Sequence, residues 1–267
     1  MSEFIRLIVR RGAFRTFRGF LIVFAAIALL PLATRAQTVD EVIAKNTQAH
    51  GGMEKLKSVQ TIRVAGKVNF GSFRAAFVQE NKRADRVREE TIIQGLAQVQ
   101  AYDGKTGWQI NPFGGRKGAE LLSADDLKSL AEDADIDGQL VDYKAKGHTA
   151  ELIGHDSVEG TDCYKVRLAL KDGTVRYYYL DTDSFLELKI ETQRTIRGTV
   201  QETEMYFGDY EEVNGLYFSF AFEGGEKGDP NRAKFTLDKV EINVPLDDAR
   251  FSMPVAKPEG KTAGGAN

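Results

Sequence analysis

The stretch Thr61-Ile-Arg-Val-Ala-Gly-Lys-Val-Asn-Phe70 decides the class of fold, because its side chains alternate in character from one residue to the next. One parity carries Ile62, Val64, Gly66, Val68 and Phe70, and the other carries Arg63, Ala65, Lys67 and Asn69. Successive side chains of a β-strand point to opposite faces of the sheet. The alternation therefore predicts a strand with one face toward a core and the other toward water.

The same period of two recurs along the chain, in residues 163–170, 186–191 and 216–223. Asp172-Gly173 and Asn214-Gly215 stand between alternating segments, where such pairs are typical of tight hairpin turns. The parity of the apolar residues slips near Lys239, which predicts a β-bulge at that point. Together these runs predict a wide antiparallel sheet with a one-sided core.

Few helices are available to cover this sheet. Thr38-Val-Asp-Glu41 is a capping box that predicts a helix up to His50, and Gly51-Gly52 ends it; a second short turn is expected over residues 53–58. Ser123 predicts the start of another helix, which runs to about Ala134. The expected fold is therefore mainly β with a few helices (α+β), an incomplete antiparallel barrel that the helices plug.

An aromatic-rich inner face covered by so few helices suggests an apolar cavity for a small apolar ligand. The alternative is that the aromatic rings simply pack against one another, and the sequence alone leaves both possibilities open. The candidate ligand-binding residues are Val64, Val68, Phe70, Tyr164, Leu168, Leu186, Leu188, Phe218, Phe220 and Phe222. Phe73, Phe77 and Trp108 are expected on the same inner face.

The helix that begins after Ser123 has a narrow apolar stripe, with Leu127 and Leu130 as its main members. Two leucines bury little apolar area, so the helix should be held weakly. We expect it to act as a lid over the cavity, with Leu127 and Leu130 as the lid residues. The alternative is a fixed helix that caps one end of the core.

The first 36 residues differ in composition from the rest of the chain. They contain six arginines and one acid around the apolar run Gly19–Leu30, and small residues precede Gln37. This pattern predicts a secretory signal peptide over residues 1–36, cleaved between Ala36 and Gln37. An uncleaved anchor is the alternative. The remaining 231 residues carry 30 basic and 38 acidic side chains, a formal charge of −8, which does not suit binding to nucleic acid.

Catalytic and metal-binding signatures are missing from the sequence. It has no Gly-x-Ser-x-Gly, His-Glu-x-x-His or phosphate-binding Gly-Lys-Ser/Thr motif. Its only cysteine, Cys163, is expected to pack in a strand, and His50 is expected to cap a helix. We therefore predict no catalytic residues, no metal and no cofactor. An enzyme acting on lipids is the least favoured class.

Several segments taken together resemble the outer-membrane lipoprotein-sorting proteins of the LolA/LolB-like superfamily. The resemblance spans residues 38–254, and the segments that carry it are Ala49-His-Gly-Gly52, Ile62–Val68, Ala101-Tyr-Asp-Gly-Lys-Thr-Gly-Trp108, Leu140–Gly147, Glu159–Val166, Asp172–Asp181 and Phe251-Ser-Met-Pro254. It implies one domain over residues 37–254, an incomplete barrel with helices at its mouth, followed by a tail over residues 255–267 that is expected to be disordered.

The resemblance also implies a function. A member of this superfamily would shield the acyl chains of lipids or lipoproteins in the periplasm, as a soluble monomer that exchanges them between an inner-membrane exporter and an outer-membrane acceptor. The absence of a cysteine after the apolar run fits the unanchored carrier. A periplasmic sensor that binds a lipid or lipoprotein and signals through a partner protein is the alternative, since it would use the same barrel.

Overall fold

The computed structural model describes residues 37–115 and 118–255. The predicted signal peptide up to Ala36 lies outside these residues, as does the predicted tail except for Val255. The elements are α1 (Val39–Ala49), α2 (Met53–Ser58), β1 (Thr61–Phe70), β2 (Phe73–Lys82), β3 (Arg86–Ile93), β4 (Leu96–Tyr102), β5 (Gly107–Ile110), β6 (Glu120–Leu121), α3 (Ala124–Asp133), β7 (Thr149–Val158), β8 (Thr161–Ala169), β9 (Val175–Asp181), β10 (Glu187–Ile196), β11 (Thr199–Val213), β12 (Leu216–Glu226), β13 (Ala233–Ile242) and the 3₁₀ turn η1 (Asp248–Arg250).

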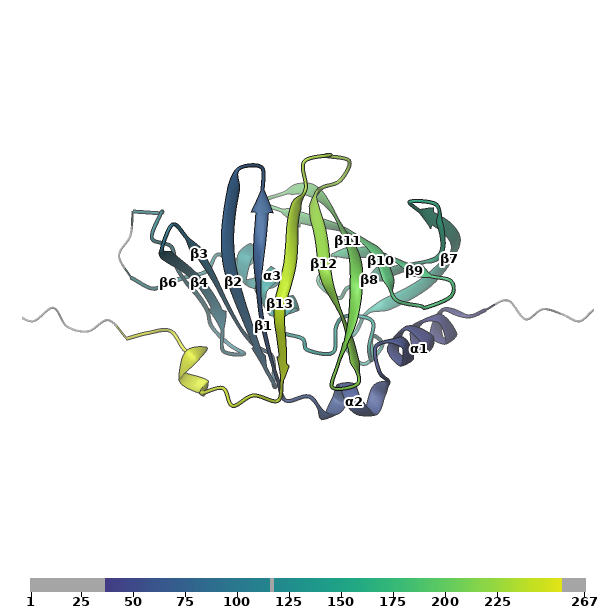
Figure 1. Ribbon diagram of the computed structural model, residues 1–267, viewed down its shortest axis with the longest axis horizontal. Coiled ribbons are helices and arrows are strands. Elements are labelled where there is room, and N and C mark those ends of the chain that lie inside the picture. Colours follow the sequence, from purple (N-terminus) through teal and green to yellow (C-terminus); the bar gives the residue numbers. More distant parts are fainter. Residues whose placement is uncertain (1–36, 116–117, 256–267) are drawn as a thin grey trace, which may run out of the picture. The chain divides into compact units, whose positions relative to one another are not determined.

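The strands form one antiparallel sheet in the order β6-β5-β4-β3-β2-β1-β13-β12-β11-β10-β9-β8-β7 (Figure 1). Each strand pairs with a sequence neighbour except at the seam where β1, near the start, pairs with β13, near the end. No ladder joins β6 to β7 within the described ranges, so the sheet stays open. The predicted fold class, a mainly β incomplete barrel, is confirmed.

Local sequence signals fix the ends of the elements as expected. Thr38 and Glu41 form the capping box of α1, with hydrogen bonds of 3.2 and 2.8 Å. Asn214 and Gly215 both have positive φ in the β11–β12 turn, as the tight hairpin requires. The register of β13 against β1 shifts beside Asp238, so the predicted bulge near Lys239 is confirmed. The bulge places Val240 opposite Val64.

The face of the sheet that α1 and α3 contact is called the inner face. α1 packs Val42 and Ile43 against Val166, Leu168 and other side chains of β8 and β9, in a sealed cluster. Leu130 of α3 and Ala134, which caps its C-terminal end, pack against Val87 of β3. Val87 pairs with Asn81 of β2, and Asn81 pairs with Ile62 of β1, so these three side chains share the inner face. Val64 and Val68 have the same parity as Ile62 and therefore lie on the inner face too.

The C-terminal segment, residues 244–255, lies on the opposite, outer face of β1–β5 and is called the strap. Phe251 of the strap is fully buried, and its carbonyl oxygen accepts a 2.7 Å hydrogen bond from Trp108 Nε1. The buried Glu80 carboxylate pairs with Arg63 and with Arg250 of the strap. Trp108 therefore belongs to the outer face, and its predicted inner-face position is wrong. The alternation of the short strand β5 shows two faces but not which one meets the helices.

Candidate functional site

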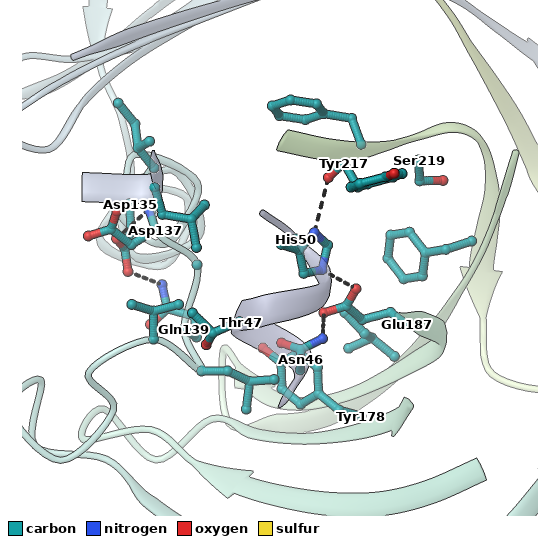
Figure 2. A pocket seen from close by; sticks show the side chains of 18 of the residues that line it. Asn46, Thr47, His50, Asp135, Asp137, Gln139, Tyr178, Glu187, Tyr217 and Ser219 are labelled. Atoms are coloured by element: carbon teal, nitrogen blue, oxygen red, sulfur yellow. Dashed lines mark hydrogen bonds and ion pairs between the residues drawn. The ribbon is translucent and has the colours of Figure 1, made fainter. Parts of the chain in front are cut away.

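The inner face has two distinct parts, which we call the polar cavity and the aromatic floor. The polar cavity has a volume of about 400 Å³ and lies between the sheet, the end of α1, α2 and the segment that follows α3 (Figure 2). Its wall includes Asn46, Thr47, His50, Leu56, Gln79, residues 132–133 and 135–141, Arg176, Tyr178, Glu187, Ile190, Phe207, Tyr210 and residues 216–219.

His50 and Glu187 form an ion pair at this wall, as Figure 2 shows. His50 Nε2 lies 2.7 Å from a Glu187 carboxylate oxygen, and His50 Nδ1 lies 3.0 Å from the backbone oxygen of Tyr217. Two acceptors therefore face the two ring nitrogens, which is the arrangement that an imidazolium, with two N–H donors, satisfies. Asn46 and Tyr210 also donate to the Glu187 carboxylate, at 3.0 and 3.2 Å.

The pKa values of this pair support the charged form. Burial alone would lower the pKa of His50, but the Glu187 carboxylate outweighs it and raises the pKa to about 9. Burial would raise the pKa of Glu187, and His50 and Asn46 overcome this and lower it to about 2. Burial and the same carboxylate raise the pKa of Tyr210. With both nitrogens engaged, His50 is not available as a general base in this arrangement.

The far side of the polar cavity ties α3 to the sheet. Glu132 pairs with Arg176 of β9 at 2.5 Å and with Arg194 of β10 at 2.6 Å, and Asn81 of β2 donates to the backbone oxygen of Asp133 at 2.6 Å. Burial of the Glu89 carboxyl, and next the negative charge of Asp133, raise the pKa of Glu89 to about 7. These polar contacts hold α3 to the sheet in addition to its two leucines.

The lid candidates occupy different environments. Leu130 is buried against Val87, whereas Leu127 is half-buried beside Gly107 of β5. A Cβ at Gly107 would lie 2.6 Å from Leu127 Cδ1, which is closer than side chains pack, so the helix sits tightly on this glycine. Opening of this helix stays a prediction.

The aromatic floor is defined by Val68, Phe77, Phe207, Phe222 and Phe235, from β1, β2, β11, β12 and β13. Phe222 and Phe235 stack with ring centroids 4.8 Å apart, and Phe77 meets Phe235 edge-on at 6.1 Å. The ring centroids of Phe207 and Phe222 are 6.4 Å apart. All five side chains are only partly buried, so the rings contact one another and still leave apolar surface open.

The structure distributes the predicted ligand-binding residues over several environments. Val64, Val68 and Phe222 lie on the inner face, with Val68 and Phe222 in the floor; Phe218 lines the polar cavity, and Phe220 lies between Phe218 and Phe222 on β12 with the same parity. Phe70 lies at the end of β1 and is about half exposed.

Three other predicted ligand-binding residues lie apart from the floor. Leu168 belongs to the sealed cluster under α1, and Tyr164, which is only partly buried, packs against that cluster. Leu186 precedes β10, where its backbone oxygen accepts from Asp181 in the turn.

Leu188 lies elsewhere, and its predicted inward orientation is wrong. The register between β9 and β10 shifts between Glu187 and Lys189. The shift turns Glu187 inward and leaves Leu188 against Cys163 and Tyr179 on the outer face. The alternation of residues 186–191 could not show this irregularity. The alternation also gives no sign of the ion pair between Glu187 and His50, because the sequence predicts only a helix-capping role for His50.

The geometry therefore defines a class: an open antiparallel barrel with helices on its inner face and an uncovered aromatic surface beside a charged cavity. No protein-family model matches the chain, and no curated protein sequence matches it. None of the helices among the described residues is long and apolar enough to cross a bilayer.

Solved structures with the same architecture do exist. A DUF1329 family protein from Desulfovibrio piger superposes with a TM-score of 0.56 at 12% identity, over 81% of this chain and 98% of that one. A LolA superfamily protein from Nitrosomonas europaea superposes with a TM-score of 0.55 at 11% identity, over 81% of this chain and 98% of that one. The resemblance to the LolA/LolB-like superfamily is thus confirmed as a resemblance of fold.

Proposed function

We propose that this protein is a periplasmic carrier that shelters an acyl chain of a lipid or lipoprotein on its aromatic floor. The observation that carries the proposal is the partly open stack of Phe77, Phe222 and Phe235 on the face where the helices lie. Apolar surface left open on a concave support is a common ligand site, and flat rings can line a flexible hydrocarbon chain without a fixed geometry.

The polar cavity supports the same proposal from the neighbouring end of the face. Phe207 belongs to both regions, so a chain lying on the floor can place its polar end beside the His50–Glu187 pair. A carrier needs no bond-making groups, and the engagement of both His50 nitrogens agrees with a binding role. Release to an exporter or acceptor protein belongs to the same proposal.

The test measures binding of a fluorescent fatty-acid probe to residues 37–267 and to a Phe222→Ser/Phe235→Ser variant. We expect the variant to bind at least about tenfold more weakly, because two ring contacts to the chain are lost. Val200→Ser is the matched control, because Val200 is exposed and away from the floor. Unchanged binding by a folded double variant would exclude the floor as the site.

A further inference from the structure

The antiparallel order of the sheet places six connections at one end: β1–β2, β3–β4, β5–β6, β8–β9, β10–β11 and β12–β13. This end is called the rim, and the β1–β2 and β12–β13 connections are seen at the top of Figure 1. α2 lies at the other end, where Lys55 contacts the β11–β12 turn through the Gly215 backbone oxygen at 3.3 Å.

Large exposed apolar side chains gather at three neighbouring connections of the rim. They are between 39% and 50% exposed, and they are Phe70 and Phe73 of β1–β2, Ile92 and Leu96 of β3–β4, and Phe113 of β5–β6. We call these five residues the apolar rim. Single exposed apolar residues are ordinary, but a gathered set on adjacent tips marks a contact surface.

The charges around the apolar rim are as uneven as its apolar residues. Residues 69–76, 91–98 and 110–115 contain a single charged side chain, the cation Arg74, in a chain whose portion after residue 36 is strongly acidic. The β12–β13 connection, by contrast, carries two acids and two bases within residues 226–232. The apolar rim therefore meets a partner that accepts apolar side chains and is negative or neutral.

The shape of the apolar rim also limits which class of partner can bind it. Its side chains stand on separate hairpin tips, and the turn residues Gly71 and Gly95 have positive φ and open space around them. Protruding tips leave gaps against a rigid protein surface, whereas lipid headgroups and acyl chains close around each tip. Aromatic and aliphatic side chains beside a cation are the composition that enters the boundary of a bilayer.

We propose that the apolar rim docks this protein on the surface of a lipid bilayer. Phe70, Phe73, Ile92, Leu96 and Phe113 enter the headgroup boundary, and Arg74 pairs with a lipid phosphate. Val68 and Phe77 of the aromatic floor lie on the strands β1 and β2, whose connecting turn carries Phe70 and Phe73. Docking would bring the floor's open end to the membrane; this last step rests on the proposed carrier function, whereas docking itself does not.

The first test uses residues 37–267, which include all described elements, and vesicles of phosphatidylethanolamine and phosphatidylglycerol. Ile92→Ser/Leu96→Ser should bind these vesicles at least about tenfold more weakly than wild type in flotation assays. Ile153→Ser, an equally exposed residue of β7, is the control and should stay within about twofold. Equal vesicle binding by wild type and the double variant would overturn the proposal.

A reporter separates bilayer insertion from other contacts. The chain has one tryptophan, Trp108, which is buried, so a second one at Phe73 reports its own surroundings. Phe73→Trp should show a blue shift and quenching by brominated lipids, and Ile153→Trp should show neither. No shift at Phe73→Trp would overturn the proposal, as would self-association that Ile92→Ser/Leu96→Ser abolishes, because it would assign the apolar rim to a protein partner.

Binding of the soluble fatty-acid probe tests the carrier function separately from docking on a bilayer. Ile92 and Leu96 are not part of the aromatic floor, so their double variant should bind the soluble probe as wild type does. Loss of vesicle binding with normal probe binding supports docking by the apolar rim. Normal vesicle binding with no probe binding by wild type would instead refute the carrier function and leave the docking intact.

Discussion

The part of the sheet under α1 and the part that carries the aromatic floor have the same alternating sequence pattern, but only the first is buried. Leu168 and Leu180 are fully buried beneath Val42 and Ile43 of α1. Phe222 and Phe235 stack on each other and stay partly exposed. Alternation therefore selects which side chains share a face of the sheet, whereas the covering helix decides whether that face becomes core or binding surface.

The largest effect is expected from removing a core side chain in the half of the sheet under α1. Leu168→Ala should lower the free energy of unfolding by about 2–5 kcal/mol, because it leaves a cavity among residues that cannot collapse. Urea unfolding followed by circular dichroism measures this. A loss below about 1 kcal/mol would show that the half under α1 is as open as the floor.

The ion pair of the polar cavity should give the next largest effect. His50→Gln removes the cation and leaves the Glu187 carboxylate, only 13% exposed, without its charge partner. We expect a loss of about 2–4 kcal/mol in urea unfolding, somewhat reduced because His50 keeps 24% exposure. The double variant His50→Gln/Glu187→Gln, which buries no charge, should recover much of it; no recovery would show that His50 acts through packing alone.

The same pair predicts a pH dependence with a definite sign. The folded pKa of His50 is raised to about 9, so its contribution to stability is complete below its ordinary pKa of 6.5 and disappears as the pH rises through 9. The Glu187 contribution disappears as the pH falls from 4.5 toward 2. Urea midpoints should therefore fall between pH 6.5 and 9.5 in wild type, and fall less in His50→Gln/Glu187→Gln. Parallel pH curves would contradict the assignment.

The smallest expected stability effect belongs to the aromatic floor. Phe235→Ala should cost about 1–2 kcal/mol, well below the range of about 3–5 for a fully buried phenylalanine, because the ring is already partly exposed. Its urea midpoint, compared with that of Leu168→Ala, ranks the two halves directly. A cost equal to that of a core phenylalanine would mean that the floor is sealed.

Much of the fold could be predicted because local signals agree with it. The capping box at Thr38, the Asn214-Gly215 turn and the parity slip at Lys239 each depend on neighbouring residues, and each is present in the structure. The inner-face position of Val64 and Val68 follows from the parity of β1 combined with its pairing.

The site was less predictable because it depends on residues far apart in sequence. His50 and Glu187 are joined by α1 docking on β10, and a register shift beside Glu187 reverses the expected orientation of Leu188. Trp108 lies under the strap because Phe251, from the end of the described chain, covers it. No short-range pattern contains either contact.

The seam between β1 and β13 also sets the order in which the fold can be completed. β1 begins at Thr61 and its partner strand ends at Ile242. The pairing of Ile62 with Ile242 therefore cannot form until almost the whole chain has left the ribosome. Such long-range pairing slows folding, because the loop must close before its contacts contribute. A nascent chain of this protein therefore lacks its central seam and its strap until the last strand is made. A truncation before residue 233 should leave β1 and β12 as two unpaired sheet edges that invite aggregation.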